Sequence, residues 1–157
     1  MAYDFFGIPV SELNVWLIWI LPFAAAMIIP AVGKFSKLTT GRVAVAFAAM
    51  SAISAATLFP MALQAHEIHH QIMWIDAIGL KAGVLADPLS VIMANVVGWI
   101  SFLIMCYSTG YMKGDKDITR FWFWMMFFIG SMQLIILSDN LLQVFFGWEG
   151  VGLASYA

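Results

Sequence analysis

Five long apolar stretches constrain the fold of this chain more than any other feature of its sequence. A helix needs roughly 20 predominantly apolar residues to cross the hydrocarbon core of a bilayer, which is about 30 Å thick. Stretches of about that length are residues 13–33, 43–65, 88–112, 121–137 and 141–157. Only 10% of the residues are charged, against roughly 25% in soluble globular chains. We therefore predict an all-α integral membrane protein with about five transmembrane helices, the last of them continuing beyond residue 157.

The charges of the connecting loops predict how these helices are oriented. Residues 34–42 carry three basic residues and no acidic one, and residues 113–120 carry three basic and two acidic residues. Residues 66–87 carry one lysine and three acidic residues. Basic loops are retained on the cytoplasmic side. We therefore predict that the two basic loops are cytoplasmic, and that the N-terminus and residues 66–87 lie on the outer face of the cell membrane.

Residues 66–87 form the longest connection, and their second half contains Gly79 and Gly83 as breakers. We expect a short hairpin there, at the membrane surface. No internal repeat or linker divides the chain, so residues 1–157 are interpreted as a single membrane domain. A formal net charge of −2 gives no basic surface for nucleic acid. The single cysteine, Cys106, lies in an apolar run, where a thiol packs as a small hydrophobic group.

The segment H-E-I-H-H at residues 66–70 formally matches the H-E-x-x-H zinc motif. On a helix this spacing places two imidazoles on one face with a carboxylate beside them, as zinc hydrolases require. The motif lies where the second apolar stretch ends, so a continuous helix is not assured there. A third ligand would have to come from Asp76 or Asp87. We therefore favour a solvated polar cap on a helix end and predict no metal site.

The fifth apolar stretch contains one acidic residue, Glu149. A helix rises about 12 Å from Leu141 to Glu149, which places the acid near the middle of a core of about 30 Å. An acid at that depth costs on the order of 3 kcal/mol, so it has to face protein or water rather than lipid. We predict that Glu149 is a proton-relay residue. The alternative is an inert structural acid held by hydrogen bonds.

Helical geometry gives Glu149 two different flanks. The side chains within about 60° of it are apolar or aromatic, namely Leu142, Phe145, Phe146, Leu153 and Tyr156. About 120° away lies a stripe of mostly small residues, which lets membrane helices approach closely, formed by Gln143, Gly147, Gly150 and Ala154. Gly152 leaves a notch beside the acid. We therefore expect close packing along the stripe, and we interpret Gly147, Trp148, Gly150 and Gly152 as residues that support Glu149.

Three polar residues outside this motif receive other interpretations. Asp139 lies at the outer end of the fifth helix, where an acid suits the helix dipole, and we expect it to cap the helix and support the site. Asn95 and Gln133 are lone polar residues in the third and fourth stretches. We expect them to hydrogen-bond between helices rather than to bind ligands.

The run L-S-D-N-L-L-Q-V-F-F-G-W-E-G-V-G-L-A-S-Y, at residues 137–156, closely resembles the large antiporter-like L subunit of respiratory complex I. Three upstream segments resemble the same family in the same order, G-V-L-A-D-P-L-S at 83–90, Y-S-T-G-Y-M-K-G-D at 107–115 and T-R-F at 119–121. The resemblance covers most of the chain from about Trp74 onward. The segment R-F-W-F-W-M-M-F-F-I-G-S-M, at residues 120–132, is similar to that of archaeal members, including those of coenzyme F420-dependent dehydrogenases.

This resemblance implies a proton-translocating membrane subunit of a redox-driven quinone oxidoreductase. In the family, the glutamate that matches Glu149 pairs with a lysine on a later helix. No such lysine is present here, because the last basic residue is Arg120. Family members have more than a dozen helices, so we expect this chain to be an N-terminal fragment. The resemblance also implies that the redox cofactors lie in partner subunits, and we expect no cofactor in this chain.

Three alternatives stay open at this stage. The related subunit of multisubunit cation/proton antiporters shares the motif set and exchanges sodium for protons without redox partners. A structural membrane anchor would use Glu149 to lock helix packing. An intramembrane zinc protease would need bound zinc at residues 66–70.

The predicted orientation can be tested by cysteine labelling in a Cys106→Ser background. We expect Lys37→Cys to react with a membrane-impermeant maleimide in inside-out vesicles only, because residue 37 lies in a basic, cytoplasmic loop. Asp76→Cys, in the acidic connection, serves as the matched control and is expected to react in right-side-out vesicles only. Labelling of position 37 from the outer face would reverse the predicted topology.

Overall fold

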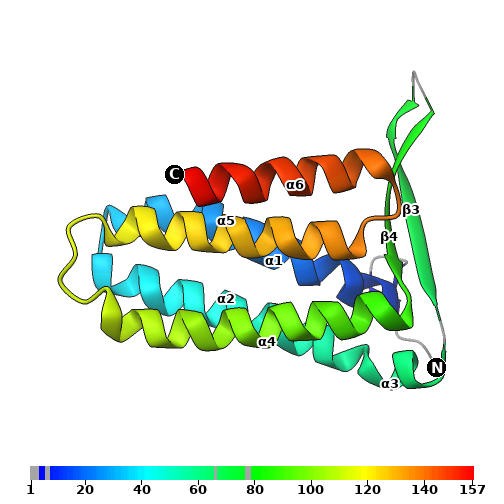
Figure 1. Ribbon diagram of the computed structural model, residues 1–157, viewed down its shortest axis with the longest axis horizontal. Coiled ribbons are helices and arrows are strands. Elements are labelled where there is room, and N and C mark those ends of the chain that lie inside the picture. Colours follow the sequence, from blue (N-terminus) through cyan, green and yellow to red (C-terminus); the bar gives the residue numbers. More distant parts are fainter. Residues whose placement is uncertain (1–3, 6–7, 66, 77–78) are drawn as a thin grey trace.

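The computed structural model describes residues 4–5, 8–65, 67–76 and 79–157, which form an antiparallel helix bundle with a β-hairpin across one end (Figure 1). The helices are α1 (Val10–Gly33), α2 (Lys37–Thr57), α3 (Phe59–Leu63), α4 (Pro88–Tyr111), α5 (Ile118–Leu137) and α6 (Leu141–Tyr156). The strands are β1 (Asp4–Phe5), β2 (Ile8–Pro9), β3 (Ile68–Ile75) and β4 (Leu80–Ala86), paired antiparallel as β1–β2 and β3–β4.

Four helical segments of the described chain are long and apolar enough to cross a membrane. They are Glu12–Gly33, Lys37–Leu63, Pro88–Tyr111 and Ile118–Leu137. The predicted all-α integral membrane fold is therefore confirmed. Helix α6 has 16 residues, which at 1.5 Å per residue gives about 24 Å, less than the roughly 30 Å of a hydrocarbon core.

The second span differs from its prediction at its start and in its middle. Helix α2 begins at Lys37, whereas the apolar pattern placed the start at residue 43, because polar residues of the first turn continue the helix beyond the apolar core. The helix is then interrupted at Leu58, where α3 begins. Pro60 explains the interruption, since it lacks an N–H and its ring collides with the carbonyl four residues earlier in a continuous helix.

The hairpin is longer than predicted. It takes in both halves of the connection, with β3 and β4 paired from Ile68↔Ala86 to Ile75↔Leu80 and a shift of register between Met73 and Ile75. Gly79 lies in the turn with a positive φ of 65°, as a breaker should. Gly83, which the sequence indicated as a second breaker, lies inside β4. The lack of a side chain at this position leaves room for the carboxyl group of Asp139.

Small side chains on α2 allow the helices of the bundle to approach closely. The buried residues of this helix are Thr40, Gly41, Ala44, Ala48, Ser51, Ala52 and Ala55. The predicted interhelical hydrogen bonds are confirmed. Asn95 Nδ2 donates to the carbonyl of Ala55 at 2.9 Å, and Gln133 Nε2 donates to that of Ala94 at 3.0 Å. Both amides thereby connect α4 to a neighbouring helix inside the bundle.

The two basic connections meet at one end of the bundle. Lys37 Nζ donates to the carbonyl of Lys116 at 2.8 Å, which joins the α1–α2 corner to the α4–α5 connection. The hairpin lies across the opposite end, where α1 begins (Figure 1). The basic and acidic connections therefore lie at opposite ends, as the charge pattern predicts. Which end faces the cytoplasm stays a prediction.

Helix α4 begins with the strongest local start signal in the chain, D-P-L-S. Asp87 is the N-cap and accepts from the N–H of Ser90 at 2.6 Å, and Pro88 occupies the first turn, where no N–H is needed. Hydrogen bonds from the hydroxyl and then the N–H of Ser90 lower the pKa of Asp87 below its ordinary value of 3.8.

We expect Asp87→Ala to lower the free energy of unfolding by about 1 kcal/mol, the usual cost of a lost N-cap. Asp87→Asn keeps an oxygen acceptor and should cost less. Because the folded protein lowers the pKa of Asp87, the charge-dependent part of this stabilisation is present above pH 3.8 and is lost as the pH falls below it. Thermal unfolding in detergent at pH 7 and pH 3 measures both effects, and equal stability of Asp87→Ala and wild type would contradict the cap.

Candidate functional site

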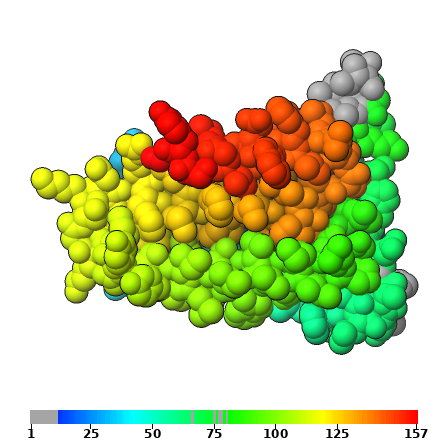
Figure 2. Space-filling view, in the orientation of Figure 1, coloured from blue at the N-terminus to red at the C-terminus, as the bar shows by residue number. Residues whose placement is uncertain are grey.

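Glu149 lies on an exposed flank of α6. The residues that helical geometry places beside it are also exposed, at 37% for Leu142, 54% for Phe145 and 52% for Leu153. Trp148 is 70% exposed. Helix α6 forms the upper border of the face shown in Figure 2, with its side chains at the surface of the bundle. The structure therefore presents the carboxylate away from the rest of the described chain.

The opposite flank of α6 is sealed against α5 by two glycines. Gly147 and Gly150 are buried, and a Cβ on Gly147 would lie 2.6 Å from Ile135 Cγ1 and 3.0 Å from the carbonyl oxygen of Ser131. A Cβ on Gly150 would collide with the hydroxyl of Ser131. The predicted close packing along this stripe is confirmed, and we call these contacts the glycine seam. No described atom lies within 4 Å of the Cβ position of Gly152, so the predicted notch is present as well.

Glu149 takes part in neither of the ion pairs found among the described residues. These join His69 to Asp139 at 3.2 Å and His70 to Glu12 at 3.6 Å, both at the hairpin end of the bundle. Helix α6 carries no basic residue, and the last one in the chain, Arg120, donates to the carbonyl of Ala157 at 3.0 Å, eight residues beyond Glu149. The carboxylate of Glu149 is thus exposed within the described chain, on a helix with no other charged residue.

The end of α6 that lies at the hairpin is capped by Asn140, not by Asp139 as the sequence suggested. Asn140 Oδ1 accepts from the N–H of Gln143 at 3.0 Å, which is the N-cap bond of α6. Asn140 Nδ2 donates to the carbonyl of Lys81 at 3.1 Å, and Gln143 Oε1 accepts from the N–H of Gly83 at 2.8 Å. The first turn of α6 is thereby attached to the backbone of β4.

Asp139 reaches past β4 to the side chains of β3. Its Oδ2 accepts from Gln71 Nε2 at 2.7 Å and lies 3.2 Å from His69 Nε2, and its Oδ1 accepts from Asn140 Nδ2 at 2.8 Å. The carboxylate crosses the strand at Gly83, where a Cβ would occupy the same space as the carboxyl group. Gly83 is therefore a glycine inside a strand because another group approaches its backbone closely.

Burial alone would raise the pKa of Asp139, whose side chain is only 3% exposed. The hydrogen bonds from Gln71, Asn140 and His69, with the charge of His69, outweigh burial and hold its pKa below the ordinary value of 3.8. We call these contacts the outer clasp, after the side on which the charge pattern predicts the hairpin. They are formed by His69, Gln71, Lys81, Gly83, Asp139, Asn140 and Gln143.

Sequence reasoning missed most of the outer clasp. The N-cap signal was present, because Asn140 lies three residues before Gln143 and asparagine is a preferred cap. The glycine at position 83 was also a signal for a close approach once that segment is read as a strand. Nothing in the local sequence indicated that Gln71 and His69 would meet Asp139, since 68 and 70 residues separate them.

The zinc motif does not form the helix that its chemistry requires. His66 lies outside the described residues, and β3 begins at Ile68, so the expected polar cap on a helix end is wrong for His69 and His70. As neighbours on a strand they point to opposite faces. His69 meets Asp139, while His70 Nδ1 accepts from the indole of Trp16 at 3.1 Å. No group of three potential metal ligands occurs within the described ranges.

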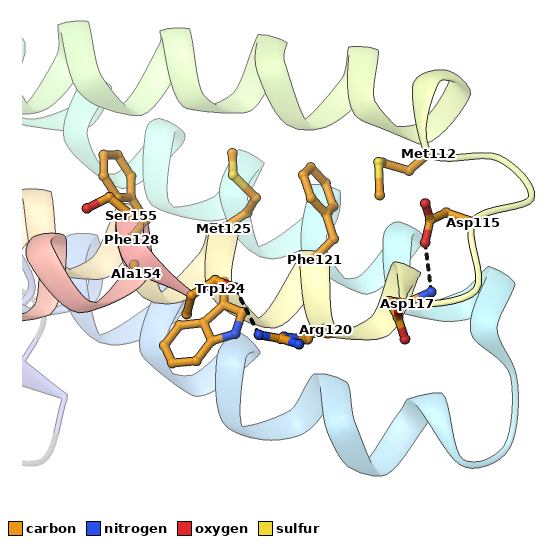
Figure 3. Close-up of a pocket in the computed structure, with 11 residues that line it drawn as sticks. Met112, Asp115, Asp117, Arg120, Phe121, Trp124, Met125, Phe128, Ala154 and Ser155 are labelled. Carbon is orange, nitrogen blue, oxygen red and sulfur yellow. Dashed lines mark hydrogen bonds between the residues drawn. The ribbon is translucent and has the colours of Figure 1, made fainter.

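A cavity of about 580 Å³ lies at the other end, between the α4–α5 connection, α5 and the last turn of α6 (Figure 3). Its polar rim contains Asp115, Asp117 and Arg120, and its wall contains the aromatic side chains of Phe121 and Trp124. The N–H of Asp117 is held by Asp115 Oδ1 at 2.7 Å. Glu149 does not line this cavity, so the cavity is separate from the predicted site.

The chain is similar in sequence to subunits of respiratory complex I. Residues 73–122 match the family model for the N-terminus of chain 5 of NADH-ubiquinone oxidoreductase (complex I). NADH-quinone oxidoreductase subunit L of Rickettsia bellii is 38% identical over 145 residues, which cover 89% of this chain and 23% of that protein. Subunit L of Mycobacterium tuberculosis is 35% identical over 149 residues, covering 90% and 23%.

A plastid relative extends this similarity. The chloroplastic NAD(P)H-quinone oxidoreductase subunit 5 of Spinacia oleracea is 34% identical over 151 residues, which cover 90% of this chain and 20% of that protein. The chain thus spans about a fifth to a quarter of the length of the curated relatives it matches. The resemblance to the L subunit that the motifs indicated is confirmed.

The fold is also found in a solved structure. A chain in the structure of the Mrp complex from Dietzia sp. DQ12-45-1b superposes with a TM-score of 0.74, covering 90% of this chain and 15% of that one. The two sequences are 22% identical, so this comparison shows a shared helical fold.

The glycine seam predicts unequal effects for two glycine substitutions on α6. We expect Gly147→Ala to destabilise the packing of α6 on α5 by about 1–3 kcal/mol, because the new Cβ meets backbone atoms of α5 that cannot rotate away. Gly152→Ala is the matched control and should leave stability unchanged or slightly raised, since its Cβ meets nothing within 4 Å among the described residues. Thermal unfolding of the purified variants measures both, and equal midpoints would exclude the seam.

Proposed function

We propose that this chain, which is similar to the first part of subunit L, forms the N-terminal portion of a proton-translocating membrane subunit in a complex I-like quinone oxidoreductase. The similarity covers nearly the whole chain. The observation that carries the proposal is the position of Glu149, which α6 presents from an exposed flank while the glycine seam holds the opposite flank on α5.

The energetics of the bilayer support a proton-relay role for Glu149. Nine residues separate it from the N-cap Asn140, a rise of about 13.5 Å along the helix. An ionised carboxylate at such a depth costs on the order of 3 kcal/mol unless it faces protein, water or a cation. The exposed flank of α6 is therefore the surface against which a further helix carrying a cation would pack. A carboxylate balanced between hydrocarbon and such a cation can take up and release a proton.

The supporting residues serve this arrangement in different ways. The buried Gly147 and Gly150 bring α6 close to α5 and so fix which side of α6 faces outward. Gly152 leaves space beside the carboxylate, where a water molecule or a partner side chain could reach it. Trp148 is largely exposed next to Glu149 and offers an apolar surface to the partner helix. Asp139 belongs to the outer clasp at the start of the same helix.

Redox chemistry in this proposal takes place in partner subunits. We propose that the chain itself carries no flavin, cluster or quinone and acts as a non-redox membrane subunit of a proton-pumping dehydrogenase that uses NADH or coenzyme F420. Its partners are the other membrane subunits, the lipid bilayer and the translocated protons. The N-terminus and the hairpin are proposed to face the outer side of the cell membrane, following the distribution of basic loops.

The solved Mrp structure favours one second candidate. Its fold superposes on this chain, so the chain could instead serve in a multisubunit cation/proton antiporter. The two functions differ in their energy source. Proton flux driven by a sodium gradient in vesicles without an electron donor would favour the antiporter, and proton flux that requires the donor would favour the oxidoreductase.

The proposal predicts the effect of removing the charge of Glu149. In the intact assembly, we expect Glu149→Gln to lower proton pumping at least tenfold and electron transfer less, because the amide fills the same space but cannot exchange a proton. Inverted membrane vesicles with a pH-sensitive dye and a simultaneous assay of donor oxidation measure both rates.

The conservative change Glu149→Asp is the control, and it should retain part of the pumping. Normal pumping by Glu149→Gln would remove the proposed role. A variant that assembles poorly but pumps normally per assembled complex would instead indicate a structural acid.

A further inference from the structure

We infer that Asp139 is a positioning residue for Glu149, because its carboxylate holds the outer end of α6 across β4 and so fixes the rotation of that helix. This inference rests on the proposed function of Glu149. It assigns a role to the outer clasp, whose residues at the start of α6 lie six to ten positions before the acid.

The first observation is that the clasp engages α6 from two strands. Asp139, just before the helix, is bound by Gln71 and His69 of β3. Asn140 and Gln143, in the first turn, bind the carbonyl of Lys81 and the N–H of Gly83 on β4. These four contacts point in different directions, and two of them go to backbone groups of β4, which cannot move with the helix. Only one orientation of the helix start about its axis satisfies all four.

The second observation is that the seam restrains α6 from Gly147 onward and not at the start of the helix. Helix α6 packs mainly on α5, and its buried residues are Gln143, Gly147 and Gly150. Glycines permit close approach, but they project no side chain into the neighbouring helix. A shift by one residue rotates a helix by about 100°. A shift that put Glu149 at the place of the buried Gly150 would move it from its exposed flank towards α5.

The third observation is that the side chain of Asp139 passes over β4 at Gly83. Asp139 reaches β3 only because Gly83 has no side chain at the crossing point. A buried carboxylate accepts hydrogen bonds and donates none when ionised, and both of its oxygens are satisfied here. The side chain of Asp139 is 3% exposed, whereas that of His69 is 51% exposed. The aspartate is thus the buried centre of the clasp.

The contact between Gly83 and Asp139 can be tested, because the effects of substitutions at these two positions should not be additive. Gly83→Ala places a Cβ where the carboxyl group lies, and Asp139→Ala removes the carboxyl group. In a double-mutant cycle, groups in contact deviate from additivity. We expect Gly83→Ala to have a large effect alone and almost none in the Asp139→Ala background.

The readout is the rate at which a hydrophobic carbodiimide modifies Glu149, measured by mass spectrometry on the assembled complex in native membranes. This rate reports the surroundings of the carboxyl group whether or not it carries protons. We expect Gly83→Ala and Asp139→Ala each to change it at least threefold, and to lower the ratio of protons pumped to electrons transferred. Asp139→Asn keeps an acceptor for Gln71 and should stay within twofold of wild type.

Matched controls are Gly110→Ala, whose Cβ meets nothing within 4 Å among the described residues, and Asp76→Asn on the exposed part of the hairpin. Both should leave the labelling rate unchanged. Gly83→Ala removes none of the groups of the clasp but displaces the carboxyl group of Asp139. Labelling of this variant at the wild-type rate would overturn the inference, as would additive effects in the double variant. Normal pumping by Glu149→Gln together with altered labelling in the clasp variants would instead refute the proposed function and leave the positioning role intact.

Discussion

The structure depends on the absence of hydrogen-bonding partners in hydrocarbon. Every backbone N–H and C=O that enters the bilayer has to be satisfied within the chain, which is why the spanning segments are helices and the strands lie at the end of the bundle. The same requirement governs the polar side chains inside. Asn95 and Gln133 donate to carbonyls of neighbouring helices, and Ser51 donates to the carbonyl of Ile18 at 2.6 Å. Polar groups within the bundle thereby join helices.

Periodicity predicts the features that repeat along one helix. The two flanks of α6 follow from 100° per residue, so the buried Gly147 and Gly150 and the exposed neighbours of Glu149 could be identified before the structure. The all-α membrane class follows from the apolar stretches in the same way. The start of α2 could not be found by this means, because hydropathy marks the apolar core and not the helix, which continues to Lys37.

Contacts between distant segments explain the rest of the differences. The sequence indicated Asp139 as the cap of α6, whereas the cap is Asn140, because the hairpin engages the aspartate from residues far earlier in the chain. The extent of the hairpin was hidden because its first strand contains histidines and a glutamine instead of a clean apolar alternation. The proton-relay role of Glu149 is a proposal that these contacts support, since they determine which way the acid faces.

The outer clasp also constrains how the protein is made. Its strand residues are synthesised some 60 residues before their partners on α6, with two membrane helices in between. The hairpin has to stay on one side of the membrane until α4 and α5 have been inserted and the α5–α6 corner reaches that same side. If either helix inserted in the wrong direction, Asp139 would be delivered to the opposite side and the cap of α6 would have no strand to join. The clasp therefore forms only when α4 and α5 have been inserted in the correct directions. The orientation of Glu149 thus depends on correct insertion of the helices that precede it.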